Sequence, residues 1–226
     1  MKEQHALVAE LVPFLLSRGY ARNERAPSER ELAVRFQTSR PQVREALSVL
    51  EALRLIERRP KSGIYLTTES ASIEALALFA ELGIPLSREE LNQTAEVRRI
   101  QELEAVRLAC RRHDDANIDE LRRCLGEWDR AIAAGEPVGE LDRDFHCGLV
   151  KATQNMVLLR LVNIFYLMTK RQREYYFQNR DRRRQSNAEH RRIFQAVLDR
   201  DEERAVQLLD AHLVSADSYW NGLLPS

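Results

Sequence analysis

The chain has few cysteines and no long uncharged apolar stretch. Its three cysteines, Cys110, Cys124 and Cys147, form no CxxC pair, so the sequence indicates neither a disulfide framework nor a thiolate zinc site, and we expect buried free thiols. No run reaches the roughly 18 to 20 uncharged apolar residues that a membrane span needs. Glu3 and Glu10 lie within the N-terminal segment, which argues against a signal peptide. We therefore expect a cytoplasmic protein.

Neither sign of charge dominates the 226 residues, which include 35 Lys and Arg and 35 Asp and Glu. A net charge of zero argues against a protein that coats nucleic acid without specificity. The distribution is uneven, however, because residues 1–68 hold 12 basic and 8 acidic side chains and the remainder holds 23 and 27. A basic excess at one end suits contact with phosphates.

Helical periodicity of the apolar residues dominates the sequence. Apolar residues return every three or four positions, glycines number only eight, and one short β-prone run surrounds residues 64–66. The pattern predicts a first helix over residues 3–17, and two further helices each begin with a capping box, Ser28–Glu31 and Ser39–Gln42. Two capped helices separated by a tight turn predict a helix-turn-helix.

Two short β-prone runs follow, at residues 55–59 and 63–67, on either side of turn-forming residues. They predict a hairpin, the wing of a winged helix. From residue 72 the pattern is helical, with starts at Ser87 and Asn117 and further helices near 138–152, 155–178, 184–199 and 202–221. We expect a mostly α fold with a winged helix-turn-helix over 1–68, a linker and connecting helix over 69–86, and a bundle of six or seven helices over 87–226.

Two parts of the chain resemble one known family. Residues 27–33 (Pro-Ser-Glu-Arg-Glu-Leu-Ala) and 39–47 (Ser-Arg-Pro-Gln-Val-Arg-Glu-Ala-Leu) resemble the N-terminal domain of GntR-family regulators. The second half resembles the FadR subgroup, which has a helical effector domain called FCD, at Glu96–Arg99, Glu102, Asp142–His146, Glu189–His190 and His212–Leu213. The resemblance implies a transcriptional regulator with a DNA-binding and a ligand-sensing domain. The chain departs from the family at residues 22–26, where Arg-Asn-Glu-Arg-Ala replaces a glycine with flanking apolar residues.

Candidate DNA contacts cluster on the predicted helix-turn-helix. Its second helix enters the major groove, and Arg40 and Arg44 lie one turn apart on that helix, where their planar forks match guanine or phosphate. Lys61 would add a phosphate contact. The resemblance implies a DNA-contact position for each of Arg30, Arg40, Gln42, Arg44 and the wing-tip Gly63. One such module contacts too few bases for specificity, so we expect a homodimer that reads an inverted repeat, with the FCD domain supplying the dimer contact in its relatives.

A candidate metal site lies in the second half of the chain. Asp142 and His146 are four residues apart, so both side chains lie on one helix face and can bind a common ion. The resemblance to FCD domains adds His190 and His212. Oxygen and imidazole ligands suit a divalent ion, with zinc as first choice and nickel or manganese as alternatives. Four protein ligands leave room for a carboxylate effector, and the resemblance also points to organic or sugar acids.

Arg98 aligns with a family arginine and is the candidate to bind that carboxylate, while the competing interpretation is a structural salt bridge to Glu102. The aromatic pair Phe165–Tyr166 could line an effector pocket, but helical aromatics more often belong to a core or a dimer interface, so neither is listed as a site residue. We hypothesise a repressor whose operator affinity changes when an acid binds at the metal. Two alternatives stay open: a metal-dependent enzyme, and a regulator in which the metal is structural or is itself the signal.

Overall fold

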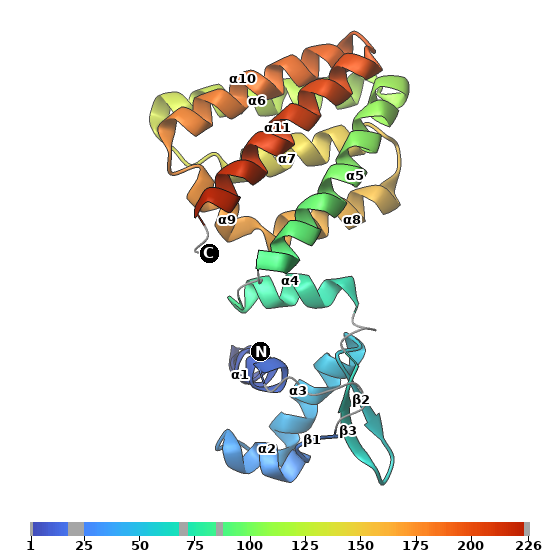
Figure 1. Ribbon diagram of the computed structural model, residues 1–226, viewed down its shortest axis with the longest axis vertical. Helices are drawn as coiled ribbons and strands as arrows, with labels where there is room; N and C mark the ends of the chain where they lie inside the picture. Colours follow the sequence, from blue (N-terminus) through green and yellow to red (C-terminus); the bar gives the residue numbers. More distant parts are fainter. Residues whose placement is uncertain (1, 18–24, 68–71, 85–87, 224–226) are drawn as a thin grey trace. The chain divides into compact units, whose positions relative to one another are not determined.

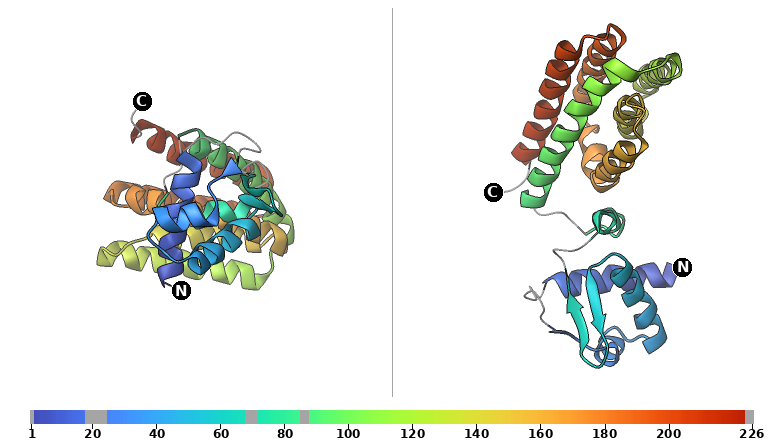
Figure 2. Two further views of the ribbon diagram at one scale, coloured as in Figure 1. Left: turned by 90° about the horizontal axis from the view of Figure 1, so that it is seen from below. Right: turned by 90° about the vertical axis from the view of Figure 1, so that its right-hand side faces the viewer.

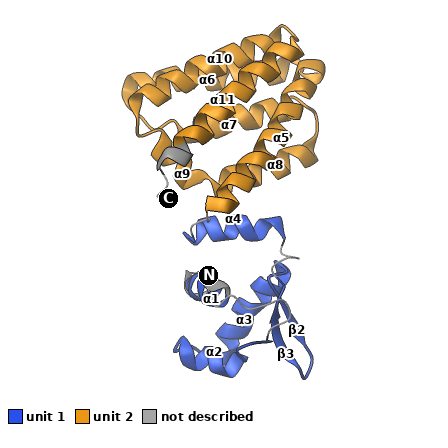
Figure 3. Ribbon diagram, in the orientation of Figure 1, with its two compact units in different colours: residues 1–85 blue, residues 86–226 orange. Residues whose placement is uncertain are grey.

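The structure is a computed structural model that describes residues 2–17, 25–67, 72–84 and 88–223. The chain divides into two compact units, residues 1–85 and 86–226 (Figure 3). Within the described ranges the fold is mostly helical, with helices α1 to α11 and one three-stranded sheet, which confirms the predicted fold class (Figure 1). No helix in these ranges combines the length and apolar character that crossing a membrane requires.

The first unit is a winged helix-turn-helix. Its elements are α1 (Lys2–Ser17), β1 (Arg25–Ala26), α2 (Glu29–Arg35), α3 (Arg40–Ala52), β2 (Ile56–Arg59), β3 (Gly63–Leu66) and α4 (Ile73–Glu81). The strands are antiparallel in the order β1-β3-β2, and the β2–β3 hairpin is the predicted wing. Strand β1 was not predicted; it falls where the chain departs from the family pattern, and residues 22–24 of that stretch lie outside the described ranges.

The core of this unit explains why the short helices α2 and α3 are stable. Leu32 of α2 and Leu47 of α3 are fully buried, together with Leu11 of α1. Burial of an apolar stripe supplies most of the stability of helices this short. Ala75 and Phe79 of α4, the helix that the sequence predicts between the domains, belong to the same core.

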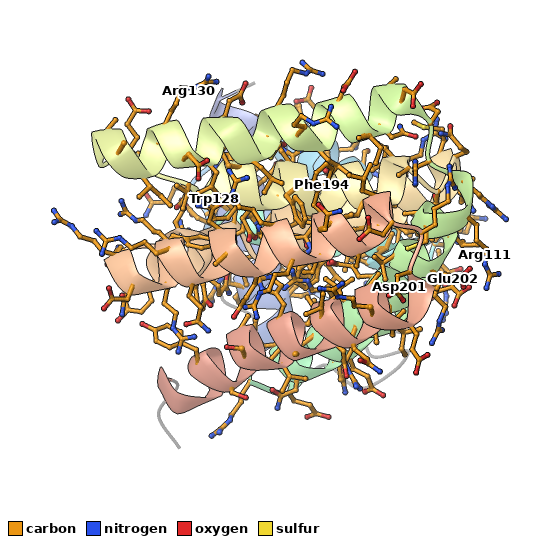
Figure 4. The ribbon with its side chains drawn as sticks, turned by 90° about the horizontal axis from the view of Figure 1, so that it is seen from above. Arg111, Trp128, Arg130, Phe194, Asp201 and Glu202 are labelled. Atoms are coloured by element: carbon orange, nitrogen blue, oxygen red, sulfur yellow. The ribbon has the colours of Figure 1, made fainter. Side chains whose placement is uncertain are left out.

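The second unit is a bundle of α5 (Arg88–Arg112), α6 (Asp115–Ala134), α7 (Gly139–Lys151), α8 (Met156–Met168), α9 (Lys170–Tyr176), α10 (Arg180–Leu198) and α11 (Glu202–Leu223). Helices α5 and α11 lie side by side (Figure 2), and Arg111 and Glu202 join them at one end with an ion pair at 2.7 Å (Figure 4). Helix α7 packs against α5, α6, α8 and α9. Gly148 of α7 lets α6 approach, because a Cβ there would lie 2.8 Å from Leu121 Cδ2.

The helix predicted over residues 155–178 is two helices, so this prediction was wrong in detail. Helix α8 ends at Met168, and the hydroxyl of the following residue, Thr169, donates to the Phe165 carbonyl at 3.0 Å. The buried Arg173 then donates to the carbonyls of Tyr166 and Gly139, at 2.9 and 2.7 Å. The first of these bonds replaces the helical partner that the Tyr166 carbonyl gives up at the turn, and the second ties the turn to the start of α7.

Two helix starts also differ from the prediction. Helix α6 begins at Asp115 rather than Asn117, because Asp114 accepts from the Asn117 amide at 2.9 Å and forms a capping box with it. Helix α10 begins at Arg180 rather than residue 184, because Asn179 caps it by accepting from the amides of Asp181 and Arg182.

Candidate functional site

The helix-turn-helix is built on the two predicted capping boxes. Ser28 and Glu31 cap α2 reciprocally, with the Ser28 amide donating to Glu31 at 2.8 Å. Ser39 and Gln42 do the same for α3, with the Ser39 amide donating to Gln42 Oε1 at 3.1 Å. Both caps fix the direction in which the helices begin.

The predicted DNA-contact side chains fall into two groups. Arg30, Arg40 and Lys61 are exposed and form no ion pair with any residue that the structure describes. Gln42 and Arg44 are exposed, but their side chains already form hydrogen bonds within the protein. Gln42 Oε1 accepts from Thr38, from the Ser39 amide and from the Ser39 hydroxyl, so only its amide nitrogen is left to contact a base. Arg44 is held by Glu29 of α2, with Nε and Nη2 donating at 3.2 and 2.9 Å.

The wing turns tightly between β2 and β3. Lys61 has a φ of 58° and Gly63 a φ of 130°, so both occupy the left-handed half of conformational space that a hairpin turn requires. The Gly63 position is also crowded, because a Cβ there would lie 2.6 Å from Arg25 Nε. Arg25 of β1 therefore lies over the wing tip, a position that the sequence patterns did not reveal.

In the second unit the four predicted metal ligands meet. Asp142 and His146 of α7, His190 of α10 and His212 of α11 are all buried, and one ligand atom from each lies within 4.8 Å of the others. Asp142 Oδ1 is 3.8 Å from His146 Nε2 and 3.7 Å from His190 Nε2, and the Nε2 atoms of His190 and His212 are 3.2 Å apart.

Two of the imidazoles are oriented by carboxylates. His146 Nδ1 donates to Glu102 at 2.6 Å, and His212 Nδ1 donates to Glu189 at 2.6 Å. Burial opposes ionisation of Glu102, but Arg98 and His146 outweigh it and hold the pKa of that carboxyl well below its ordinary value. Hydrogen bonds of this kind fix the tautomer, so the Nε2 atoms of both rings carry lone pairs that face the shared space.

His190 is oriented by packing instead. Its ring stacks on Phe145 with centroids 4.1 Å apart and meets the edge of Trp128 at 4.9 Å. Figure 4 shows Trp128 pointing from α6 toward α10. The Nδ1 atom of His190 has no hydrogen-bond partner among the residues that the structure describes, although the ring is fully buried. We therefore assign the hydrogen to His190 Nε2, from which it donates to His212 Nε2.

The residues fit a divalent cation. Three buried nitrogens and one carboxylate oxygen converge, and such an ion would take the place of the hydrogen between His190 and His212. Burial lowers the pKa of His190 well below its ordinary value and also lowers that of His212, so both rings remain neutral, as metal ligands must be. Asp142 within the cluster, and Glu102 and Glu189 behind two of its histidines, place carboxyl groups on several sides of the position that a cation would take.

Arg98 reaches the edge of this cluster. Its Nε donates to Glu102 Oε1 at 2.7 Å, and its Nη2 donates to the Tyr166 hydroxyl at 2.8 Å and lies 3.4 Å from His146 Nε2. The salt bridge that the sequence offered as the competing interpretation is therefore present. The same pair directs the rest of the guanidinium toward the predicted metal ligands.

Sequence reasoning did not assign Glu102, Glu189 or Tyr166 to the site. Glu102 and Glu189 entered as residues of the FCD resemblance, Glu102 also as the i+4 partner of Arg98, and Tyr166 as an aromatic of the core, the dimer interface or an effector pocket. Tyr166 is indeed buried, but its hydroxyl donates to Glu102 at 2.6 Å. Burial also raises the pKa of this hydroxyl well above its ordinary value, so it remains a donor. Two signals were available: both glutamates belong to the FCD resemblance, and metal-bound histidines donate the hydrogen of their second nitrogen to a carboxylate.

Comparison with known proteins agrees with this architecture. Residues 4–66 match the bacterial regulatory proteins of the gntR family, and residues 93–215 match the FCD domain. The chain is 29% identical to the HTH-type transcriptional regulator LutR of Bacillus subtilis, over 88% of this chain and 92% of LutR. It is 32% identical to the Nta operon transcriptional regulator of Aminobacter aminovorans, over 82% of this chain and 80% of that one.

Among solved structures, Lar, which controls the expression of the Listeria monocytogenes agr system, has a TM-score of 0.68 at 16% identity and covers 97% of each chain. At that identity the likeness shows the fold alone. The sequence relatives are transcriptional regulators, so the alternative of a metal-dependent enzyme is set aside. The chain belongs to the gntR family of bacterial regulatory proteins, carries an FCD domain, and is a DNA-binding transcriptional regulator.

Proposed function

We propose that this regulator senses a small carboxylate at a divalent metal ion held by Asp142, His146, His190 and His212, and that the acid changes its affinity for an operator. The observation that carries the proposal is the convergence of these four buried side chains, within 4.8 Å of one another, beside the guanidinium of Arg98. When bound, the ion would supply coordination positions that the protein leaves open. Zinc is the first choice, and nickel or manganese would also suit one oxygen and three imidazole ligands.

The charge of Arg98 supports an anionic effector. Nη2 of Arg98 faces the Nε2 atom of His146 at 3.4 Å. A cation that takes the lone pair of this atom leaves the N–H without its acceptor and places two positive groups side by side. A carboxylate satisfies both, because it accepts from the guanidinium and balances the added charge. The effector class that fits is an organic or sugar acid.

We propose that the protein acts in the cytoplasm as a homodimer on an operator with an inverted repeat, and that the acid relieves repression. Arg30, Arg40, Gln42, Arg44, Lys61 and Gly63 form the proposed DNA-reading face. Helices α5 and α8 pack against each other, and both leave apolar side chains exposed. These side chains support a dimer contact: Val97, Ile100, Met156 and Val157. The acid must bind one arrangement of the two DNA-binding units better than the other, since otherwise no affinity changes.

The test begins with metal content. We expect about one ion per chain in the purified protein by elemental mass spectrometry, and none in an Asp142→Ala/His190→Ala variant. His113→Ala, which removes a histidine outside the cluster, serves as the matched control and should retain the ion. Absence of metal from the wild type, with no uptake on adding zinc, nickel or manganese, would remove the metal from the proposal. Operator affinity unchanged by organic and sugar acids in the loaded protein would remove the effector.

A second candidate role has its own support. The four ligands come from α7, α10 and α11 and are all buried, so a bound ion would cross-link three helices of the bundle. A metal with a structural role, or one that is itself the signal, would use the same site. Removal of the metal separates these possibilities: unfolding supports a structural role, loss of acid binding in a folded chain supports sensing, and a direct change in operator affinity supports a metal signal.

A further inference from the structure

The ion pair between Glu29 and Arg44 joins the two helices of the DNA-reading face. Glu29 is the first residue of α2, and both of its oxygens accept from Arg44 of α3, at 3.2 and 2.9 Å. Arg44 remains 59% exposed and Glu29 only 20% exposed, so the carboxylate lies behind a guanidinium that still reaches solvent. The hydrogen bond from Arg44 is the largest of the effects that lower the pKa of Glu29.

The other long basic side chains assigned to the same face are not restrained in this way. Arg30, Arg40 and Lys61 are exposed and form no ion pair in the part of the chain that the structure describes, although Arg40 acts on Glu29 and Arg30 on Glu31 at longer range. An unpaired surface cation attracts any phosphate, whatever the DNA sequence. A cation that is already neutralised by a bidentate carboxylate gains little from an additional phosphate unless the pair is broken.

The pair also restricts where Arg44 can point. A guanidinium has five N–H groups, and Glu29 takes the one on Nε and one on Nη2. The hydrogens on the opposite edge keep a fixed direction and can donate to a base edge. Arg58 offers a useful contrast, because its pairing with Glu51 includes its own backbone amide, at 3.1 Å, and so anchors the wing to α3.

We propose that Glu29 is a specificity-determining residue, which aims Arg44 at the bases of the operator and withholds its charge from the phosphates of other DNA. The inference depends on the proposed role of Arg44 in DNA contact. It predicts that removing the carboxylate strengthens binding to unrelated DNA more than binding to the preferred sequence.

The test compares Glu29→Gln with wild type on two duplexes, one selected by the wild-type protein from a randomised pool and one with the same bases scrambled. Glutamine keeps one acceptor for Arg44 but removes the charge. Affinity for the scrambled duplex should rise about three- to tenfold at moderate salt, and the slope of log affinity against log salt should steepen by about 0.9, the value of one added phosphate contact. The ratio of affinities for the two duplexes should fall by a similar factor.

Glu45→Gln is the matched control, because Glu45 is exposed on α3 and its loss changes the net charge equally. If Glu29→Gln and Glu45→Gln affect both duplexes alike, the inference is overturned. Arg44→Ala tests the proposed DNA contact separately from the role of Glu29: if it weakens neither complex, Arg44 does not contact DNA. Circular dichroism checks folding, and Glu29→Asp, which keeps the charge at the start of α2 but has a shorter reach, should also lower the affinity ratio if Glu29→Gln proves unstable.

Discussion

Replacing Glu102 by Gln tests the hydrogen-bond network behind the proposed metal ligands. Three donors converge on this buried carboxylate: His146 Nδ1 at 2.6 Å, Arg98 Nε at 2.7 Å and the Tyr166 hydroxyl at 2.6 Å. A glutamine has one acceptor oxygen, and its NH₂ group must face at least one of these donors. If the NH₂ faces His146, the ring must adopt the tautomer with its hydrogen on Nε2, which cannot bind metal. If it faces Arg98 and Tyr166, the guanidinium loses the partner that aims it.

We therefore expect zinc affinity to fall about 10- to 100-fold in Glu102→Gln, the usual effect of losing a partner that orients a metal-bound histidine. This corresponds to about 1.4 to 2.8 kcal/mol of binding free energy. Competition against a fluorescent chelator measures the affinity directly. The rise in melting temperature on adding zinc should shrink in parallel, because an ion that binds only the folded state stabilises it in proportion to its binding free energy.

Glu189→Gln is the control for this prediction. Glu189 orients His212 in the same way but has no bond to Arg98. Both variants should lose zinc affinity, whereas at saturating zinc only Glu102→Gln should also lose stabilisation by added acids. A folded Glu102→Gln protein that binds zinc as tightly as wild type would refute the reasoning, since the carboxylate would then have no effect on the ligand that it contacts.

Three further predictions concern stability. Ser39→Ala removes the cap of α3 and should lower the free energy of unfolding by about 1 kcal/mol in a urea titration; an unchanged midpoint would mean that the cap is not needed. Gly63→Ala should destabilise by about 1 to 3 kcal/mol, because its φ of 130° is strained for any residue with a Cβ. Since the flexible Arg25 side chain can move away, adding Arg25→Ala should not restore the melting temperature, and full rescue would assign the effect to crowding instead. Burial lowers the pKa of His190 and His212, so below about pH 6.5 the unfolded chain binds protons that the folded chain does not. The metal-free protein should therefore become less stable to urea as the pH falls from neutral to about 5, and constant or rising stability would show that the rings are protonated in the folded chain.

Local interactions made the first unit easy to predict. The capping boxes at Ser28 and Ser39 each involve residues three apart, and the wing depends on a turn between adjacent strands, so all their determinants lie close together in the sequence. The break at Thr169 was missed because it depends partly on Arg173, whose bond to the Gly139 carbonyl spans 34 residues. Periodicity reports which face of a helix is apolar, not where a bond to a distant part of the chain favours a turn.

The candidate site shows the same difference between local interactions, which can be predicted, and long-range ones, which cannot. Spacing alone placed Asp142 and His146 on one helix face, but only a family resemblance could add His190 and His212, because nothing in the intervening sequence dictates how α10 and α11 pack. Glu102 illustrates the limit most clearly. Its bond to Arg98 spans one helical turn and was foreseen, whereas its bonds to His146 and Tyr166 span 44 and 64 residues.

The bonds of Glu102 to His146 and Tyr166 change the role of its ion pair with Arg98. An exposed i,i+4 pair contributes only about 0.3 to 0.5 kcal/mol, and its arginine is free to sample many rotamers. Here the side chain of Glu102 is 2% exposed and that of Arg98 is 11% exposed, so an unpaired charge at either position would be strongly unfavourable. The ion pair therefore fixes the guanidinium instead of competing with ligand recognition. Because Arg98 is already ordered beside the proposed metal ligands, an acid that bound there would not lose the conformational entropy that a mobile arginine would have to give up.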